Sequence, residues 1–324
     1  MSLDQIDMKR IGFPISHKEN ERRRALVPDH LAMVAHPERL FIERGYGEVL
    51  GYEDEDYARW GVGVVSRQEV LRMEVICDPK LGDGDYLAEL HDQTVFGWLH
   101  AVRNREIADS LIAGGLTAYA WEDMNENGRH SFWRNNEIAG EAAVAHAYMI
   151  HGVFPYNTKV AVIGRGNTAR GAVKMLSSMG ADVTVYDRHS ERLVSEELPQ
   201  YDVVVNAVMW DTRRRDHIIC VEDLARMKRG SMIIDISCDL AGAIESSVPT
   251  TIENPTYFAH GVRHYVVDHT PSLFYKTSSE SLSREVVKYL DLLSSGEENE
   301  VLRAAKCIER GEILDRRIIE FQGR

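Results

Sequence analysis

The chain has 324 residues, with 38 Lys and Arg against 51 Asp and Glu, and a formal net charge of −13. That length suggests about two domains. The acidic balance argues against a broad nucleic-acid-binding face, which needs basic residues to neutralise phosphates, and against adhesion to an anionic membrane. No apolar run approaches the roughly 18 residues of a membrane span. The N-terminus lacks the apolar segment of a secretory signal.

Neither the cysteines nor the histidines are spaced like metal ligands or a disulfide framework. The sequence contains no CxxC and no HExxH motif, which are common signatures of such sites. We therefore expect no metal site, and reduced, buried thiols in a cytoplasmic protein. The residues concerned are Cys77, Cys220, Cys238, Cys307, His130, His146 and His151.

The first half of the chain alternates short apolar runs with amphipathic stretches, which is typical of an α/β fold. We expect strands at residues 10–13, 75–77, 95–99 and 117–121. Helical patterns lie between them, at residues 30–44, 69–72 and 105–114. The turn sequence Asn-Glu-Asn-Gly at residues 125–128 marks the edge of this first unit.

The second half begins with residues 137–150, which are rich in Ala, contain no Pro and predict a long connecting helix. Near-continuous Val and Ile runs then indicate parallel strands that are covered on both faces. We expect these strands at Lys159–Ile163, 183–186, 203–205 and 232–236, and a helix at residues 169–179. The polar tail predicts helices at residues 281–293 and 299–310, which we expect to pack back on the first domain.

A glycine-rich turn follows the predicted strand Lys159–Ile163. It reads Gly164-Arg-Gly166-Asn-Thr-Ala169, a GxGxxA pattern that opens a predicted helix. Gly164 permits the tight turn, Gly166 lets the backbone approach a pyrophosphate, and the small Ala169 lets helix and strand pack closely. The helix N-terminus then faces the phosphates with free N–H groups and a positive dipole end. The motif and its context predict dinucleotide binding.

The next strand ends in Asp187, 23 residues after Gly164. An acid about 20 residues after the turn typically accepts hydrogen bonds from the ribose hydroxyls of NAD. The Asp187 carboxylate would repel the 2′-phosphate of NADP, whereas Arg188 could pair with that phosphate or stack on the adenine. NAD and NADP both stay open, with a preference for NAD(H). The predicted cofactor-binding residues are Gly164, Gly166, Asn167, Thr168, Ala169, Asp187, Arg188 and Ala207.

Seven motifs, in order along the chain, resemble the alanine dehydrogenase and transhydrogenase family. They are KENERRRALVP (18–28), DPK (78–80), GWLH (97–100), the GxGxxA turn, IDISCD (234–239), NPTY (254–257) and HYVVDHTPS (264–272). The resemblance implies two Rossmann-like, doubly wound domains with the site in the cleft between them. We assign residues 1–130 and about 272–324 to a substrate domain, and residues 131–271 to an NAD(P)-binding domain.

The same resemblance implies roles for four residues. Arg23 would anchor a keto-acid carboxylate, and Lys80 would hydrogen-bond the keto oxygen. His100, which ends a predicted strand, would move protons near neutral pH. Asp239 would lie near substrate and nicotinamide, where it could orient water, orient the proton of an imine nitrogen, or hold the amine. A second substrate needs groups of its own, and those available are Glu122, Glu137 and Arg263.

Residues 97–100, 136–138 and 265–275 are most similar to family members that join pyruvate to the amine of an amino acid. We therefore expect NAD(P)H-dependent reductive condensation of pyruvate with an ornithine-like or lysine-like amine. Those members use NADPH, and an acid at the position of Asp187 is not expected in them. The alternatives are an amino acid dehydrogenase of the alanine type, a saccharopine-dehydrogenase-like enzyme, and a nicotinamide-sensing protein. We expect small-molecule substrates, a homo-oligomer, and no nucleic-acid or membrane partner.

Overall fold

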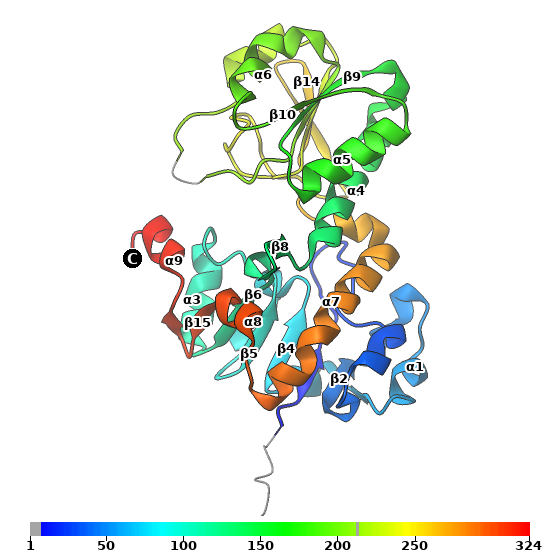
Figure 1. The fold of residues 1–324 in the computed structure, drawn as a ribbon, viewed down its shortest axis with the longest axis vertical. Coiled ribbons are helices and arrows are strands. Elements are labelled where there is room, and N and C mark those ends of the chain that lie inside the picture. The colour runs from blue at the N-terminus through cyan, green and yellow to red at the C-terminus, as the bar shows by residue number, and fades with distance from the viewer. Residues whose placement is uncertain (1–7, 212–213) are drawn as a thin grey trace, which may run out of the picture. The chain divides into compact units, whose positions relative to one another are not determined.

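The computed structural model describes residues 8–211 and 214–324, which fold into two compact units (Figure 1). Unit 1 comprises the residues up to Phe132 together with Tyr275–Arg324, and unit 2 comprises Trp133–Phe274. Each unit is a mixed α/β structure around its own sheet. Within the described ranges, no helix has the length and apolar character needed to cross a membrane.

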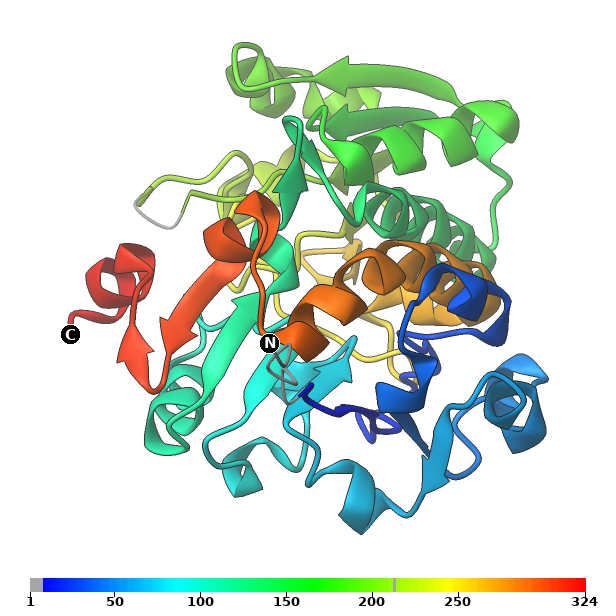
Figure 2. The same cartoon turned by 60° about the horizontal axis from the view of Figure 1, so that its bottom comes forward.

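Unit 1 is built on an eight-stranded sheet, counted over the described residues. Strands β1 to β6 run parallel, and the C-terminal β15 and β16 continue the sheet antiparallel beyond β6 (Figure 2). The order across the sheet is β16 (Glu312–Ile313), β15 (Lys306–Glu309), β6 (Thr117–Ala120), β5 (Thr94–Gly97), β4 (Val75–Asp78), β1 (Ile11–Phe13), β2 (Leu40–Glu43) and β3 (Gly63–Val65). A separate hairpin joins β7 (Asn125–Glu126) to β8 (Arg129–His130).

Both faces of this sheet are covered, because alternate residues of a strand point to opposite sides. Val75 and Cys77 of β4 belong to one hydrophobic core, together with the buried stripe of α7 (Tyr275–Ser295). Helix α7 lies against the sheet (Figures 1 and 2). Ile76 belongs to a second core, which includes Leu111 of α3. The helices of unit 1 are α1 (Asp54–Ala58), α2 (Arg67–Val70), α3 (Arg105–Ala113), α7 (Tyr275–Ser295), α8 (Glu300–Ala305) and α9 (Arg316–Gln322). Its 3₁₀ turns are η1 (Pro28–Met33), η2 (Pro37–Arg39), η3 (Glu48–Leu50), η4 (Leu81–Asp83), η5 (Leu87–Glu89) and η6 (Trp121–Asp123).

Unit 2 has a six-stranded sheet, counted over the described residues, that is parallel except for β13 at one edge. The order is β10 (Asp182–Tyr186), β9 (Lys159–Ile163), β11 (Val203–Asn206), β12 (Met232–Asp235), β14 (Val262–Tyr265) and β13 (Thr256–Ala259). Its helices and 3₁₀ turns are α4 (Trp133–His151), α5 (Asn167–Ser178), α6 (Glu191–Glu197), η7 (Pro155–Asn157), η8 (Leu198–Gln200), η9 (Val221–Arg226) and η10 (Thr270–Phe274). Separate cores fill its two faces.

Two predicted helices are wrong in whole or in part. Residues 30–44 form η1, η2 and then strand β2, because Pro37 cannot continue a helix and disfavours helical backbone at His36. The alternating burial of β2 also fits a strand. Residues 299–310 form the short helix α8 and then β15, which pairs with β6.

Candidate functional site

The sheet of unit 1 changes its winding direction between β1 and β4. The chain passes from β1 to β2 and β3 on one side, and then to β4 and β5 on the other. In open α/β sheets, ligands bind beyond the carboxyl ends of the strands at such a switch point. Three predicted site residues follow strands at this edge: Arg23 comes after β1, Lys80 after β4 and His100 after β5.

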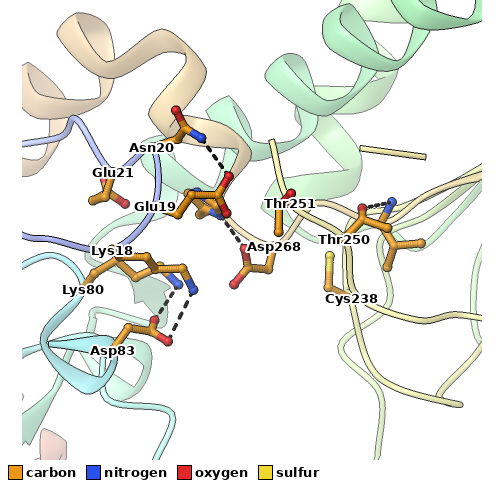
Figure 3. Close-up of polar contacts among 12 residues, drawn as sticks. Lys18, Glu19, Asn20, Glu21, Lys80, Asp83, Cys238, Thr250, Thr251 and Asp268 are labelled. Atoms are coloured by element: carbon orange, nitrogen blue, oxygen red, sulfur yellow. Dashed lines mark hydrogen bonds and ion pairs between the residues drawn. The ribbon is translucent and has the colours of Figure 1, made fainter. Parts of the chain in front are cut away.

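Lys80 is buried and shares a carboxylate with a second lysine (Figure 3). The Nζ atom of Lys80 lies 3.1 Å from Oδ2 of Asp83, and Nζ of Lys18 lies 3.3 Å from Oδ1 of the same residue. Burial alone would raise the pKa of Asp83, but the two ammonium groups outweigh it and lower the pKa. Two ammonium groups close to one another are a feature that suits an anionic substrate.

Arg23 forms a buried ion pair with Glu21. Its Nε and Nη2 atoms donate to the two carboxylate oxygens at 2.8 and 2.6 Å, and its guanidinium lies 5.3 Å from the centre of the Trp98 ring. Burial would raise the pKa of Glu21, but Arg23, with help from Lys80, lowers it. The sequence predicts that the Arg23 guanidinium binds a keto-acid carboxylate, but its Nε and Nη2 atoms face Glu21. A substrate carboxylate would therefore have to approach Arg23 from another side.

The Glu122 carboxylate holds the loop that carries His100. Oε1 of Glu122 accepts a hydrogen bond from the backbone N–H of His100 at 2.6 Å, and Oε2 accepts one from Leu99 at 3.2 Å. His100 has a φ of +55°, in the left-handed region that residues with a side chain rarely adopt. Glu122 thus stabilises a strained backbone at the end of β5.

Asp78 anchors the start of the Lys80 loop from inside the protein. Its carboxylate is fully buried and accepts hydrogen bonds from the Tyr86 hydroxyl at 2.6 Å and from the Lys80 backbone N–H at 2.9 Å. Burial raises the pKa of Asp78 to about 6, although both hydrogen bonds oppose the shift. The Asp78 carboxyl group therefore fixes the position of the Lys80 backbone just after β4.

The sheet of unit 2 has its own switch point, between β9 and β11. Gly164 follows β9 with a φ of +117°, and a Cβ there would lie 2.8 Å from the backbone oxygen of Ala207. Gly166 precedes α5, and no described atom lies within 4 Å of where its Cβ would be. No described side chain caps this end of α5. A close backbone approach and an uncapped helix N-terminus are what a pyrophosphate requires.

Helix α5 is held against α4 by glycine contacts. A Cβ on Gly171 would lie 1.9 Å from the backbone oxygen of Glu137, and one on Gly140 would lie 2.0 Å from that of Thr168. Ala169 is buried in a hydrophobic core that also contains Ala143 of α4. Close packing around α5 therefore depends on Gly140 and Gly171 as well as on the small Ala169. The sequence analysis gave these two glycines no role.

Asp187 directly follows β10, beside the glycine-rich turn. Its Oδ1 accepts hydrogen bonds from the His189 backbone N–H at 3.0 Å and from the Ser190 hydroxyl at 3.2 Å. Its Oδ2 lies 3.6 Å from Nη1 of Arg165. The His189 hydrogen bond, together with Ser190 and Arg165, lowers the pKa of Asp187, so the group is a carboxylate at neutral pH. Arg188 is exposed.

The loop after β12 carries Asp239 and is organised by Asp235. The buried Asp235 carboxylate accepts hydrogen bonds from the Asn206 side chain at 2.8 Å and from the Ser247 hydroxyl. Cys238 has a φ of +55°. Asp239 is half-buried and lies in unit 2, at the edge where the predicted nucleotide motif lies. The structure thus places Asp239 in unit 2, and Arg23, Lys80 and His100 in unit 1.

Comparison with known proteins assigns the family. Residues 12–133 match "Alanine dehydrogenase/PNT, N-terminal domain", and residues 188–319 match the corresponding C-terminal domain. The chain is 32% identical over 316 residues to N(5)-(carboxyethyl)ornithine synthase of Clostridium botulinum, a match that covers 89% of this chain and 99% of that protein. This chain belongs to the alanine dehydrogenase/PNT family.

Other similarities agree with that family. The chain is 27% identical to alanine dehydrogenase of Bacillus subtilis, over 94% of this chain and 92% of that protein. A solved L-alanine dehydrogenase shares the fold, with a TM-score of 0.79 at 23% identity over 97% of this chain and 99% of that one. Residues 129–238 also match "D-isomer specific 2-hydroxyacid dehydrogenase, NAD binding domain". The predictions of an α/β fold with a Rossmann-like domain, of an oxidoreductase, and of a nicotinamide cofactor are confirmed.

Within this family member, several residues near the predicted site were not assigned a role from sequence. Glu21 pairs with Arg23, and Asp83 pairs with Lys80. Lys18 pairs with the same Asp83 carboxylate. Glu21 lies two residues before Arg23, and Asp83 three residues after Lys80, so an acid close to each cation was the available signal. Of the charged residues considered for a second substrate, Glu122 supports His100, Glu137 pairs with Arg134 and Arg170, and Arg263 stacks on Phe258.

Proposed function

We propose that this protein catalyses the NAD(H)-dependent reductive condensation of a 2-keto acid, pyruvate in the first instance, with the amino group of an amino acid. The observation that carries the proposal is the nearly full-length similarity to an N(5)-(carboxyethyl)ornithine synthase, which spans 99% of that relative. The product would be an N-(carboxyethyl) amino acid. When bound, the reduced nicotinamide supplies the hydride.

The keto acid would bind at the switch point of unit 1. Its carboxylate would meet the positive charge of Lys18 and Arg23, and its keto oxygen would accept a hydrogen bond from Lys80. A buried ammonium group polarises a carbonyl more strongly than an exposed one, because low dielectric strengthens the interaction. Asp83 and Glu21 hold these cations in place before substrate arrives, which lowers the cost of orienting them.

His100 would transfer protons as the amine adds to the carbonyl and water leaves. Its imidazole is exposed, and its backbone is fixed by Glu122. Asp239 would orient the proton on the imine nitrogen. The residues near the predicted dinucleotide motif support NAD(H), because Asp187 presents a charged carboxylate where a 2′-phosphate would otherwise lie.

The deciding experiment measures oxidation of NADH and of NADPH with three mixtures: pyruvate alone, pyruvate with ammonia, and pyruvate with L-ornithine or L-lysine. Turnover that requires the amino acid, with the N-(carboxyethyl) product identified by mass spectrometry, is the expected result. Lys80→Met should abolish it, whereas Lys276→Met, at an exposed position of α7 in the same unit, should not. Cofactor binding without turnover in any mixture would refute the proposal.

A second candidate is an alanine-dehydrogenase-like reaction, in which ammonia replaces the amino acid. The similarity to alanine dehydrogenase of Bacillus subtilis over 92% of that protein favours it. Both reactions use the same keto-acid residues, so the amine distinguishes them. Turnover with ammonia at least as fast as with L-ornithine would support this candidate over the condensation.

A further inference from the structure

The carboxyl edge of the unit 2 sheet carries an acid–histidine pair that the proposed function leaves without a role. Asp268 and His269 follow β14, and Nδ1 of His269 is hydrogen-bonded to Oδ1 of Asp268. His269 is only 2% exposed, whereas the Asp268 side chain is 35% exposed. The Asp268 carboxylate, labelled in Figure 3, is thus partly accessible to solvent, whereas the His269 ring is buried.

The segment that carries the pair is held firmly. The Ser272 backbone N–H donates to the His269 backbone oxygen at 3.0 Å, and the Thr270 hydroxyl donates to the backbone oxygen of Ala139 in α4 at 3.0 Å. An orientation fixed in this way costs little entropy when a ligand binds.

Strand order places the pair at one end of the expected dinucleotide path. Asp187, at the end of β10, marks the adenosine side, and the glycine-rich turn after β9 marks the pyrophosphate. The nicotinamide half must therefore extend over β11 towards β12. Asp268 follows β14, three strand positions from β9, or about 14 Å at the usual strand spacing. A nicotinamide half that reached β12 would end one strand position from Asp268, so a second substrate beside the ring would lie near this carboxylate.

The other acids at this edge are less suited to bind an amine. Asp187 lies on the adenosine side, and Asp235 is fully buried with both oxygens hydrogen-bonded. Asp239 follows β12, one strand closer to the nicotinamide. Asp268 is the acid at the substrate end that is both accessible and oriented by a buried donor.

We propose that Asp268, positioned by His269, binds the ammonium group of the amino-acid substrate. This inference rests on the proposed condensation and names the residue that recognises its second substrate. A carboxylate that a buried histidine orients accepts a charge-assisted hydrogen bond from a primary ammonium. The bound ammonium has no lone pair, so it must lose a proton before its nitrogen can attack the keto carbon. The Asp268 carboxylate that it contacts is positioned to accept that proton.

The test is equilibrium binding of L-ornithine to the protein saturated with NADH, by calorimetry, alongside turnover of the wild type with pyruvate. We expect Asp268→Asn to weaken L-ornithine binding by 10- to 100-fold and leave the NADH dissociation constant unchanged. Asp268→Glu should recover most of the affinity. Asp182→Asn, the same charge change at the amino end of β10, is the matched control and should bind like the wild type.

The position of His269 is tested separately. His269→Gln keeps a side-chain N–H donor and should bind L-ornithine nearly as well as the wild type, whereas His269→Leu should match Asp268→Asn. A general loss of structure would instead weaken NADH binding in both variants. In turnover, the effect should fall on the KM for L-ornithine and leave the KM for pyruvate unchanged.

The outcomes separate the inference from the proposed function. Unchanged L-ornithine affinity in Asp268→Asn overturns the inference, and wild-type condensation would still uphold the function. Affinity lost in Asp268→Asn while the wild type fails to condense supports the inference and refutes the function. A wild type that binds no L-ornithine overturns the inference.

Discussion

Glu122 accepts a hydrogen bond from the backbone N–H of His100 at 2.6 Å and so supports a residue whose φ is +55°. A hydrogen bond to a charged acceptor is worth about 1.5–3 kcal/mol. This bond compensates for the strain at His100 and fixes the direction in which the imidazole leaves β5. Glu122 and His100 therefore act as one structural unit, although 22 residues separate them in the chain.

Removing the Glu122 charge should impair the proton-transfer step. We expect Glu122→Gln to lower kcat about tenfold and Glu122→Ala to lower it further, because the alanine leaves two backbone N–H groups without their acceptor. Steady-state kinetics would measure kcat, and circular dichroism would check that each variant is folded. Glu106→Gln, on the surface of α3 in the same unit, is the control. Equal kcat values for Glu122→Ala and wild type would contradict the prediction.

Asp78 should make the stability of the protein fall as the pH rises from 4 to 6. Burial raises the pKa of Asp78 from 3.8 to about 6, so within this window the folded chain holds a proton that the unfolded chain has lost. The stabilising effect of that proton is complete below pH 4 and gone above pH 6. The shift of about two pKa units corresponds to about 3 kcal/mol at most.

Asp78→Asn tests this effect, because the amide cannot titrate. Urea unfolding of both proteins at pH 4, 5, 6 and 7 gives the difference in unfolding free energy, wild type minus variant. This difference should fall by about 2 kcal/mol from pH 4 to pH 7. A difference that is constant across the range would show that Asp78 has an ordinary pKa.

Gly171→Ala should destabilise the protein, although alanine ordinarily stabilises a helix over glycine by about 1 kcal/mol. The new Cβ would lie 1.9 Å from the backbone oxygen of Glu137, and a backbone atom cannot move aside cheaply. Overpacking of this kind costs about 1–3 kcal/mol. Thermal unfolding should show a lower Tm for Gly171→Ala and an unchanged one for Ser177→Ala, at an exposed position of α5. A raised Tm for Gly171→Ala would show that α4 and α5 do not pack this closely.

Asp187→Ser should weaken NADH binding about tenfold and strengthen NADPH binding. The substitution removes an acceptor for ribose hydroxyls together with the charge that repels a 2′-phosphate, and Arg165 and Arg188 remain nearby. Fluorescence titration with each cofactor measures both changes, with Asp182→Asn on the same strand as control. If the ratio of the two affinities does not change, Asp187 does not select the cofactor.

Much of the candidate site could be predicted from sequence, because its residues lie in short motifs at strand ends. The GxGxxA turn and Asp187 depend on local spacing, and the structure places them after the adjacent strands β9 and β10. The two acids that hold cations, the buried Glu21 and the partly exposed Asp83, were not predicted as site residues. A carboxylate near a lysine or arginine in sequence is usually a solvated pair, and only burial makes it a positioning group.

The fold shows the same division. Apolar runs such as Lys159–Ile163 determine parallel strands by themselves, because continuous Val and Ile suit a strand that is buried on both faces. The sequence predicts a helix where the structure has strand β15. A short segment of mixed polarity takes its conformation from the partner that supplies its hydrogen bonds, and that partner is β6.

The sequence by itself determined the strand-turn-helix of the nucleotide motif and the identity of the charged residues, since both depend on neighbours along the chain. Tertiary structure alone decided which acid meets which cation, why His100 tolerates its backbone conformation, and how closely α4 approaches α5. Those properties depend on burial and on contacts between distant segments. An electrostatic interaction changes several-fold in strength with its surroundings, and residue order does not record them.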